Sequence, residues 1–250
     1  MKFTFGITTT TEPQRMTHGT ENHVREIIES IRRNNIPEDS YETIVIGGKN
    51  EYQNDSDVTF IEFDDVTRPG WFTRKKNIIT ETAKFENIVY THDYLILDDN
   101  WYNGFLKFGN EWDICMCVIL AKEGHRFRDW IAWDDPELCY NIDGFGHRIA
   151  IVPYDYNKLH YMQISGFWWV AKKWMMEKDP LDEELVQGKS EDVEWSMRVR
   201  NKYNYVMNTN SIVKILREEK RLSAYYVEER DAGKYIARAP GPWKTKFKND

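Results

Sequence analysis

Two short segments of the sequence combine acidic, basic and imidazole side chains in patterns that could support chemistry. In the first, "IVYTHDYLIL", His92 and Asp93 interrupt an apolar run that otherwise has the composition of a buried strand. An unpaired charge in apolar surroundings costs free energy, so this pair needs a partner. A carboxylate and an imidazole at a strand end suit a divalent cation such as Mn²⁺ or Mg²⁺. Taken alone, the two residues could equally form an ordinary His-Asp pair at the protein surface.

The second segment, "GKSEDVEWS", opens a stretch with helical spacing and places two acids at its start. Asp192 is expected in the first turn, where the helix dipole favours the ionised carboxylate. Such a carboxylate can take the proton of a hydroxyl nucleophile as a general base. The same letters also predict a capping box with Ser190 at the N-cap, and both interpretations can hold for the same residues.

A third segment, "RKKN", lies upstream of His92 and contains Arg74, Lys75, Lys76 and Asn77 at the predicted start of a helix. Basic side chains at a helix N-terminus favour binding of phosphate oxygens. A solvated basic patch is the alternative, at least for one of the lysines. A phosphate-binding helix start followed by a metal-binding strand end would together accommodate a nucleoside diphosphate and its cation.

These segments sit in a chain whose pattern alternates between strands and helices. "KFTFGIT", "TIVIGG" and "VTFIEF" have strand character, and a helix with Thr20 as its N-cap and ending before Pro37 separates the first two. Further strands are predicted at "WDICMCVIL" and "RIAIVPY", and a final hairpin over 203–215. This order predicts an α/β fold with a mostly parallel sheet, in which ligands gather at the carboxyl ends of the strands.

The chain shows no internal repeat and no Pro/Ser-rich linker, so we expect one domain over residues 1–250. Within it we expect a first half over 1–100, a second half over 101–215 and a C-terminal tail over 216–250.

Composition excludes several classes of protein. A formal charge of -7 argues against a general nucleic-acid binder. The spacing of the three cysteines matches neither a disulfide framework nor a zinc site. The N-terminal segment has no long apolar region, and the longest apolar stretch, 114–121, is far below the ~20 residues needed to span a bilayer. We therefore expect a cytoplasmic protein without a transmembrane segment.

In order and spacing, the sequence resembles the GT-A glycosyltransferases, particularly those of glycosyltransferase family 2. The matching pieces are "GITTTTEP", "RKKN", "THDY" and the "ISG" strand followed by "SEDVEWSMR", over roughly residues 3–200. The resemblance implies a GT-A fold: a mixed, mostly parallel sheet flanked by helices. "THDY" lacks the first acid of the family's "DxD" motif, which leaves Asp93, with His92 beside it, as the expected metal ligand.

The resemblance also implies a role for each segment: 1–100 would be the nucleotide-sugar half, and 101–215 the acceptor and catalytic half. Asp192 would be the catalytic base and Glu191 would orient the acceptor. Asp64 or Asp65 could reach the ribose. Donor-binding positions are expected at Thr8, Thr9, Glu12, Gly47, Gly48, Asn50, Arg74, Lys75, Asn77, His92 and Asp93.

Acceptor binding is expected from aromatic side chains that can stack on a sugar ring. The candidates are Trp101, Trp168 and Trp169, with Trp130 and Trp133 as part of the same wall. If the segment is a strand, Trp168 and Trp169 point to opposite faces, so one of them should belong to the core. His147 and His160 are weaker candidates for the metal site.

The sequence thus predicts a metal-dependent, inverting glycosyltransferase that moves a sugar from a UDP-sugar to a glycan or other hydroxyl acceptor. A sugar-1-phosphate nucleotidyltransferase is an alternative, but "ITTTTEPQRM" lacks the Gly-rich basic signature expected after its first strand. The second alternative is a non-catalytic carbohydrate-binding protein, which the aromatic content of 14% would suit.

Overall fold

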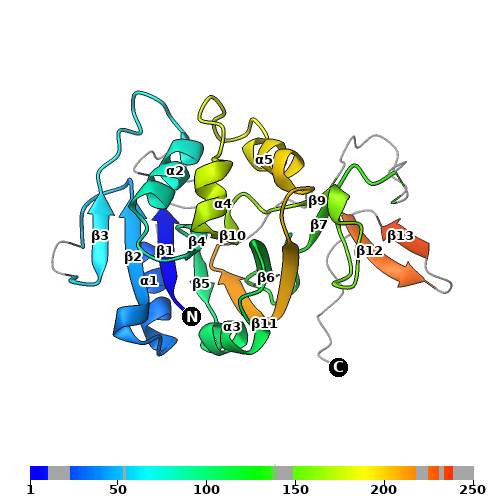
Figure 1. The fold of residues 1–250 in the computed structure, drawn as a ribbon, viewed down its shortest axis with the longest axis horizontal. Helices are drawn as coiled ribbons and strands as arrows, with labels where there is room; N and C mark the ends of the chain where they lie inside the picture. Colours follow the sequence, from blue (N-terminus) through cyan, green and yellow to red (C-terminus); the bar gives the residue numbers. More distant parts are fainter. Residues whose placement is uncertain are drawn as a thin grey trace.

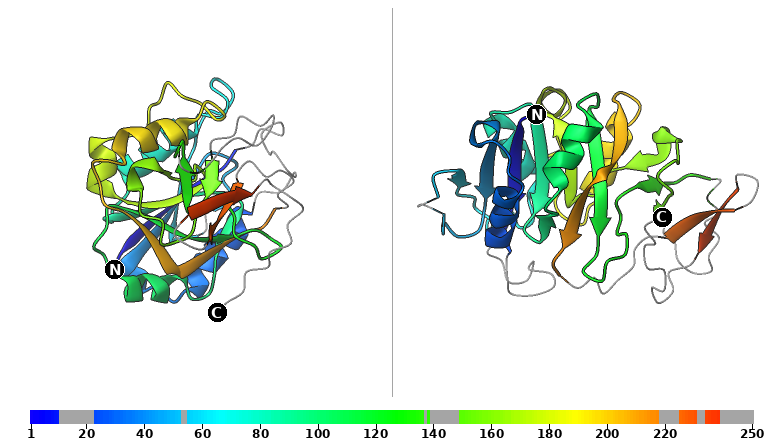
Figure 2. Two further views of the ribbon diagram at one scale, coloured as in Figure 1. Left: turned by 90° about the vertical axis from the view of Figure 1, so that its right-hand side faces the viewer. Right: turned by 90° about the horizontal axis from the view of Figure 1, so that it is seen from below.

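The computed structural model describes residues 1–10, 23–52, 55–136, 138 and 149–217, and two strands in the C-terminal region. These residues form a mixed sheet, sheet A, with helices on both of its sides (Figures 1 and 2). Its strand order is β3-β2-β1-β4-β10-β6-β11-β5. The strands are β1 (Phe3–Thr8), β2 (Tyr41–Ile46), β3 (Val58–Ile61), β4 (Asn87–His92), β5 (Leu95–Leu97), β6 (Ile114–Leu120), β10 (Trp168–Lys172) and β11 (Tyr205–Ile215).

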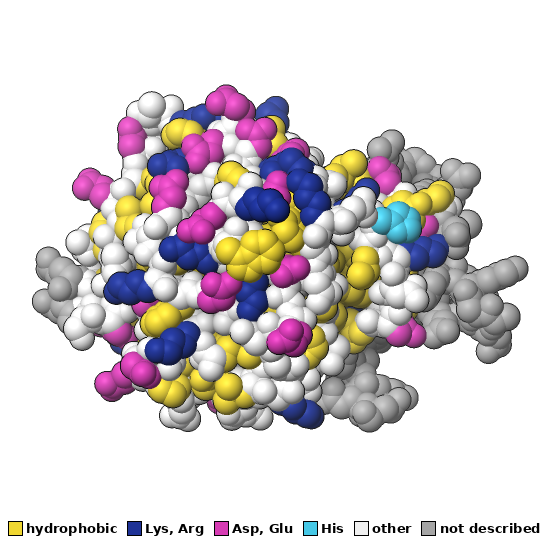
Figure 3. All heavy atoms as spheres, in the orientation of Figure 1, with side chains coloured by type: hydrophobic (Ala, Val, Ile, Leu, Met, Phe, Trp, Pro, Cys, Tyr) yellow, Lys and Arg dark blue, Asp and Glu magenta, His cyan; other side chains and the backbone are white. Residues whose placement is uncertain are grey.

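Two layers of helices cover sheet A. In Figure 1, α2 (Phe72–Thr82), α4 (Lys173–Lys178) and α5 (Glu191–Val199) lie above the sheet. On the other side lie α1 (Val24–Arg33) and α3 (Trp101–Phe108). Among the described residues, no helix has the length and apolar character that a membrane span requires. Acidic and basic side chains are interspersed over the face drawn in Figure 3, without a patch of one sign.

The first four strands of sheet A run parallel, as the alternation of strands and helices predicts. Thr8 at the end of β1 lies opposite Ile46 of β2 and His92 of β4, so these three strands end at the same edge. The sheet is covered on both sides, and every residue of β1 is buried. The alternation of Phe3, Phe5 and Ile7 with threonine and glycine therefore does not mark an exposed face, because helices cover both sides of the parallel strands.

Helix α1 confirms the predicted apolar stripe but not the predicted cap. Val24, Ile27, Ile28 and Ile31 are all buried, as their 3–4 residue spacing requires. The helix begins at Val24, and His23 at its N-cap makes no side-chain capping hydrogen bond. The proposed cap, Thr20, lies outside the described residues.

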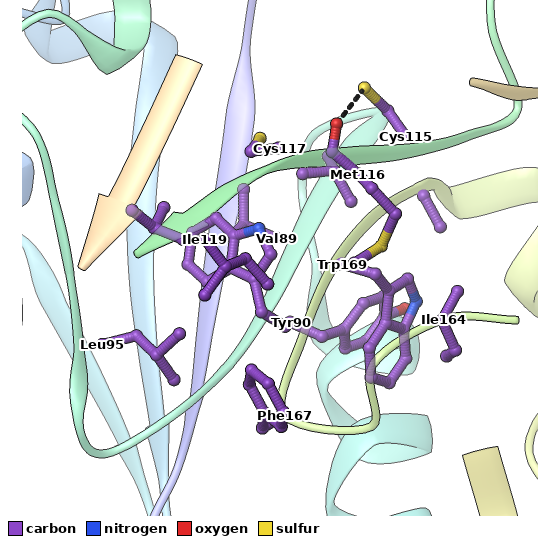
Figure 4. Close-up of a cluster of buried hydrophobic side chains, with 14 of the residues drawn as sticks. Val89, Tyr90, Leu95, Cys115, Met116, Cys117, Ile119, Ile164, Phe167 and Trp169 are labelled. Carbon is purple, nitrogen blue, oxygen red and sulfur yellow. Dashed lines mark hydrogen bonds between the residues drawn. The ribbon is translucent and has the colours of Figure 1, made fainter. Parts of the chain in front are cut away.

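Strand β10 enters the sheet in the opposite direction and separates the parallel half from β6. It pairs antiparallel with β4 on one side and with β6 on the other. Trp169 of β10 stacks on Tyr90 of β4 with ring centroids 4.7 Å apart, and the two rings face each other in Figure 4. Cys115 and Cys117 of β6 are buried in the same core.

The C-terminal third differs from the expectation. Residues 203–215 do not form a hairpin: they lie mainly in one strand, β11, which pairs parallel with β6 and antiparallel with β5. The register of β11 shifts between Asn208 and Ile212. A second sheet has the order β13-β12-β8-β7-β9, and β12 and β13 come from the predicted tail. Its strands are β7 (Ile131–Trp133), β8 (Ile149–Ile151), β9 (Met162–Gln163), β12 (Tyr225–Arg230) and β13 (Lys234–Arg238).

Candidate active site

The carboxyl ends of β1 and β4 place a hydroxyl beside a carboxylate. Thr9 and Asp93 directly follow these paired strands, and Thr9 Oγ1 donates a hydrogen bond of 2.7 Å to Asp93 Oδ2. Burial raises the pKa of Asp93, while the bond from Thr9 acts in the opposite direction. Asp93 is thus a desolvated carboxylate held in one orientation at the edge where ligands of a parallel sheet gather.

His92 lies beside Asp93 as a neutral imidazole. Its ring stacks on Phe72 at 4.6 Å, and its Nε2 atom is buried without a hydrogen-bond partner. Desolvation lowers the pKa of His92 well below its ordinary value, and the charges of Lys76, Arg217 and Lys75 add to this effect. A neutral ring with a free nitrogen can ligate a metal ion or contact a polar group of a ligand.

A divalent cation fits this pair only with help from water and substrate. The described residues contain no group of three or more His, Cys, Asp or Glu side chains that could hold a metal ion. Mg²⁺ is commonly bound through one or two carboxylates together with substrate phosphates and waters. Asp93, with the orphaned Nε2 of His92, matches that sparse donor set.

Lys75 supports the strand ends from inside the protein. Its side chain is 1% exposed, and its Nζ atom lies 2.6 Å from Asp65 Oδ1 and donates to the carbonyl oxygen of Thr9 at 2.5 Å. Gly47, with φ of +85°, is required here, because a Cβ would lie 2.6 Å from that Nζ atom. Lys75 therefore holds the end of β1. Its ion pair engages Asp65, one of the two aspartates, Asp64 or Asp65, that were expected to reach the ribose.

Arg74 and Asn77 are placed differently from the prediction. Asn77 donates to Glu183 Oε1 at 2.9 Å and accepts a hydrogen bond from the backbone N–H of Leu181. Arg74 pairs with Glu183 at 3.0 Å and with Glu81 at 2.7 Å. Both side chains thus fasten the segment between α4 and α5, and their polar groups are engaged there rather than facing the strand ends.

The start of α5 places the two acids against the turn that precedes β10. The N–H of Gly166 donates to Asp192 Oδ2 at 3.2 Å, and that of Val193 donates to Asp192 Oδ1 at 3.0 Å. A Cβ on Gly166 would lie 3.0 Å from the Asp192 carboxylate, so glycine permits this close approach. Burial raises the pKa of Glu191, and the charge of Asp192 adds to it. Ser190 is at the N-cap as predicted, but its side chain makes no capping bond.

The same turn joins the two halves of the site. The N–H of His92 donates to the carbonyl oxygen of Phe167 at 3.0 Å, directly after the glycine that contacts Asp192. The segment 166–167 therefore connects the end of β4 to the start of α5. The two segments that the sequence singled out, 99 residues apart from Asp93 to Asp192, meet across one turn.

The three tryptophans predicted to stack on an acceptor sugar are all in the core, and this prediction is wrong. Trp101, Trp168 and Trp169 are at most 1% exposed. Trp101 packs against Phe3 and Phe5, and Trp168 meets it edge-on at 6.4 Å. Because β10 is a central strand covered on both faces, alternate residues are buried on both sides, and neither Trp presents a ring to solvent.

The other residues that the sequence predicted for the site lie in several different surroundings. Thr8 is fully buried, whereas Asn50 is exposed and its Oδ1 accepts a hydrogen bond from the N–H of Tyr52. Gly48 has φ of +72° and packs on Thr9. Asp64 is engaged in its own turn with Thr67. Trp130 is buried, Trp133 is half-buried and His160 is exposed, while Glu12 and His147 lie outside the described residues.

Two cationic residues near the strand ends were not assigned to the site from the sequence, although Lys76 is part of the basic segment "RKKN". Lys76 lies on the inner stripe of α2 with Phe72 and Ile79, a spacing that the sequence displays. Arg217 follows β11 and its guanidinium lies 3.5 Å from the centroid of the Tyr94 ring. The charge of Arg217 acts on both His92 and Asp93, and no local pattern indicates this placement because β11 is distant in sequence.

No family model and no curated protein matches this sequence. Solved structures match it in fold. S. aureus TarS has a TM-score of 0.60 at 12% identity, covering 86% of this chain and 36% of that chain. S. aureus TarS 1-349 in complex with UDP-GlcNAc has a TM-score of 0.53 at 13% identity, covering 97% and 60%. GalNAc-T7 with UDP, GalNAc and Mn2+ has a TM-score of 0.60 at 12% identity, covering 88% and 44%.

The chain therefore has the fold of the GT-A glycosyltransferases, which confirms the fold expected from the resemblance. It spans less than two thirds of the length of each of these solved chains.

The buried ammonium of Lys76 predicts a pH-dependent stability. Desolvation lowers the pKa of Lys76 from 10.5 to about 8, although Glu191 and Asp192 act in the opposite direction. Between these pH values the unfolded chain binds more protons than the folded one, so this residue's contribution to the free energy of unfolding rises with pH. The full change corresponds to about 3 kcal/mol.

We expect this rise in the wild type relative to Lys76→Met, measured by urea denaturation between pH 7.5 and 10. Lys84→Met, which removes an exposed lysine just after α2, serves as the control and should follow the wild type. Parallel curves for the wild type and Lys76→Met would contradict the prediction.

Proposed function

We propose that this protein transfers a sugar from a UDP-sugar to a hydroxyl group of a glycan or other acceptor, with inversion at the anomeric carbon. The observation that carries the proposal is the junction at residues 166–167, which contacts Asp192 on one side and the end of β4, next to that of β1, on the other. In a direct displacement the catalytic base must lie next to the donor-binding site, because the attacking oxygen and the leaving oxygen act on the same carbon atom.

The structural neighbours support the choice of donor. TarS 1-349 has been solved with UDP and with UDP-GlcNAc, and GalNAc-T7 with UDP, GalNAc and Mn2+. We extend a UDP-sugar donor and a divalent cation to this chain on the basis of the shared fold and of the residues at its strand ends.

In the proposed reaction, the acceptor oxygen attacks the anomeric carbon of the donor sugar from the face opposite the diphosphate. The bond from that carbon to the diphosphate oxygen breaks, UDP leaves with the electron pair, and Asp192 takes the proton of the acceptor hydroxyl. The proton thus ends on the carboxyl group of Asp192, and the configuration at the anomeric carbon is inverted.

The hydrogen bonds on Asp192 suit this role. Each of its carboxylate oxygens accepts one backbone N–H, from Gly166 and from Val193. An ionised carboxylate has about four lone-pair sites, so capacity for the acceptor hydroxyl is left. Glu191, whose pKa is raised by burial, would hold a second hydroxyl of the acceptor.

On the donor side, Asp93 and His92 would hold the cation, and Thr9 fixes the Asp93 carboxylate. The cation, when bound, stabilises the negative charge that develops on the departing diphosphate. Arg217 would add a positive charge from the protein itself, since its field reaches both ligand residues.

The carbohydrate-binding alternative depended on exposed aromatic rings. The burial of Trp101, Trp168 and Trp169 removes its main support, and the junction between Asp192 and the strand ends has no role in it. We therefore keep the transferase as the proposed function.

Replacement of Asp192 by Asn tests the base. We expect turnover to fall by about 100 to 10,000-fold, because the amide cannot take the proton, with UDP binding unchanged. Transfer is measured with radiolabelled UDP-sugars and a panel of sugar acceptors, and binding by calorimetry. Glu194→Gln is the matched control, since Glu194 is on the same helix but pairs with Arg198. Near-normal transfer by the Asp192 variant would refute the base assignment.

Thermal unfolding with UDP and Mn²⁺ tests the cation. Ligand at about 100 times its dissociation constant adds ~2.7 kcal/mol, which should raise the unfolding midpoint by roughly 5 to 10 °C. We expect a chelator, or Asp93→Asn, to abolish the shift, whereas Asp99→Asn, a change of an exposed acid nearby in sequence, should keep it. A shift that survives both the chelator and Asp93→Asn would show that this carboxylate and a metal are not needed for donor binding.

A further inference from the structure

Helix α2 carries two buried lysines in succession, and they have different partners. Lys75 has its own carboxylate, Asp65, at 2.6 Å. In the part of the chain that the structure describes, Lys76 has no carboxylate within 4.0 Å, although it is only 2% exposed. A buried ammonium without a close counter-ion costs free energy, so its retention calls for a reason beyond packing.

Apart from the core residue Trp169, the groups around Lys76 belong to the candidate site. Its Nζ atom donates to the carbonyl oxygen of Gly166 at 2.5 Å and lies 4.6 Å from the centroid of the Trp169 ring. The carboxylates of Glu191 and Asp192 act on it from α5, and its own charge acts on His92 at the end of β4. The ammonium is therefore placed between the base side and the donor side of the site.

Gly166 links Lys76 to the proposed base directly. Its carbonyl oxygen accepts from Lys76, and its N–H donates to Asp192 Oδ2. A Cβ on Gly166 would lie 3.0 Å from Asp192, so glycine permits this close contact. Gly166 thereby fixes the separation between the ammonium of Lys76 and the carboxylate of Asp192. Replacement of Lys76 would thus affect Asp192 in two ways: through the backbone of Gly166 and through the loss of the ammonium charge.

We propose that Lys76 is a positioning residue of the transfer reaction: through the carbonyl oxygen of Gly166 it anchors the turn before β10, so that Asp192 faces the acceptor hydroxyl. This inference rests on the proposed function, because it assigns the base to Asp192. Lys75, by contrast, holds the end of β1 through the carbonyl oxygen of Thr9 and is neutralised by Asp65.

The test compares Lys76→Met with the wild type, and uses Lys84→Met as a control. Methionine keeps much of the length and the apolar contact with Trp169 but loses the charge and the donor. We expect turnover at saturating donor to fall about 100-fold, as for a misplaced catalytic group, with the KM for the donor within about 3-fold of the wild type. Lys84→Met, at an exposed position, should retain wild-type turnover.

A second readout does not require transfer. In protein labelled with ¹³C at the side-chain carboxyl groups of Glu and Asp, NMR titration follows the pKa of Glu191. Lys76 lowers this pKa in the wild type, so Lys76→Met should raise it, whereas Lys84→Met should not. Native folding of each variant is checked by its unfolding transition and by retained binding of UDP.

The outcomes separate the two proposals. A loss of turnover with retained UDP binding and a raised Glu191 pKa supports the role of Lys76. Unchanged turnover or an unchanged Glu191 pKa in a folded Lys76→Met overturns it. If the wild type transfers no sugar but the Glu191 pKa still rises in the variant, the proposed function fails while the coupling between Lys76 and the α5 acids stands.

Discussion

The candidate site depends on one structural constraint: β10 runs antiparallel into the middle of a sheet whose first strands are parallel. Its pairing with β4 puts the turn that precedes it at the carboxyl ends of the parallel strands. There Phe167 accepts a hydrogen bond from His92, and Gly166 meets Asp192 and Lys76. If β10 ran parallel, this turn would lie at the opposite edge, and no residue of α5 would be held beside Asp93.

The site is also costly in electrostatic terms. Two lysines, an aspartate and a histidine are desolvated close to the strand ends. Burial is the largest cause of the pKa shifts of His92, Asp93 and Lys76. Buried charges rarely add stability, because their desolvation offsets most of their attraction. Their concentration at the edge of the sheet fits a role in binding or catalysis, where preorganised charges contribute most.

Local patterns in the sequence predicted the parallel strands, the buried face of α1 and the position of the α5 acids, because each depends on spacing within a few residues. The rotation of α2 was missed. Arg74, Lys75 and Asn77 were all chosen for their chemistry as donor-binding residues, without using the i, i+3, i+4 spacing that puts Lys75 and Lys76 inward with Phe72. The tryptophans were misjudged because burial of both faces of β10 depends on helices elsewhere in the chain. The position of Arg217 could not be predicted from local patterns, since it depends on the pairing of β11 with β5.

Helix α2 is attached on two sides. Its inner stripe bears the lysines that contact Thr9 and Gly166, and its other side is tied to the segment leading into α5 through Thr73, Arg74 and Asn77. The position of α5 and the position of the strand ends therefore both depend on the backbone of α2. In the proposed transferase, substitutions in segments that α2 does not contact could change the acceptor preference alone, whereas a shift of α2 itself would displace the binding sites of both reactants together.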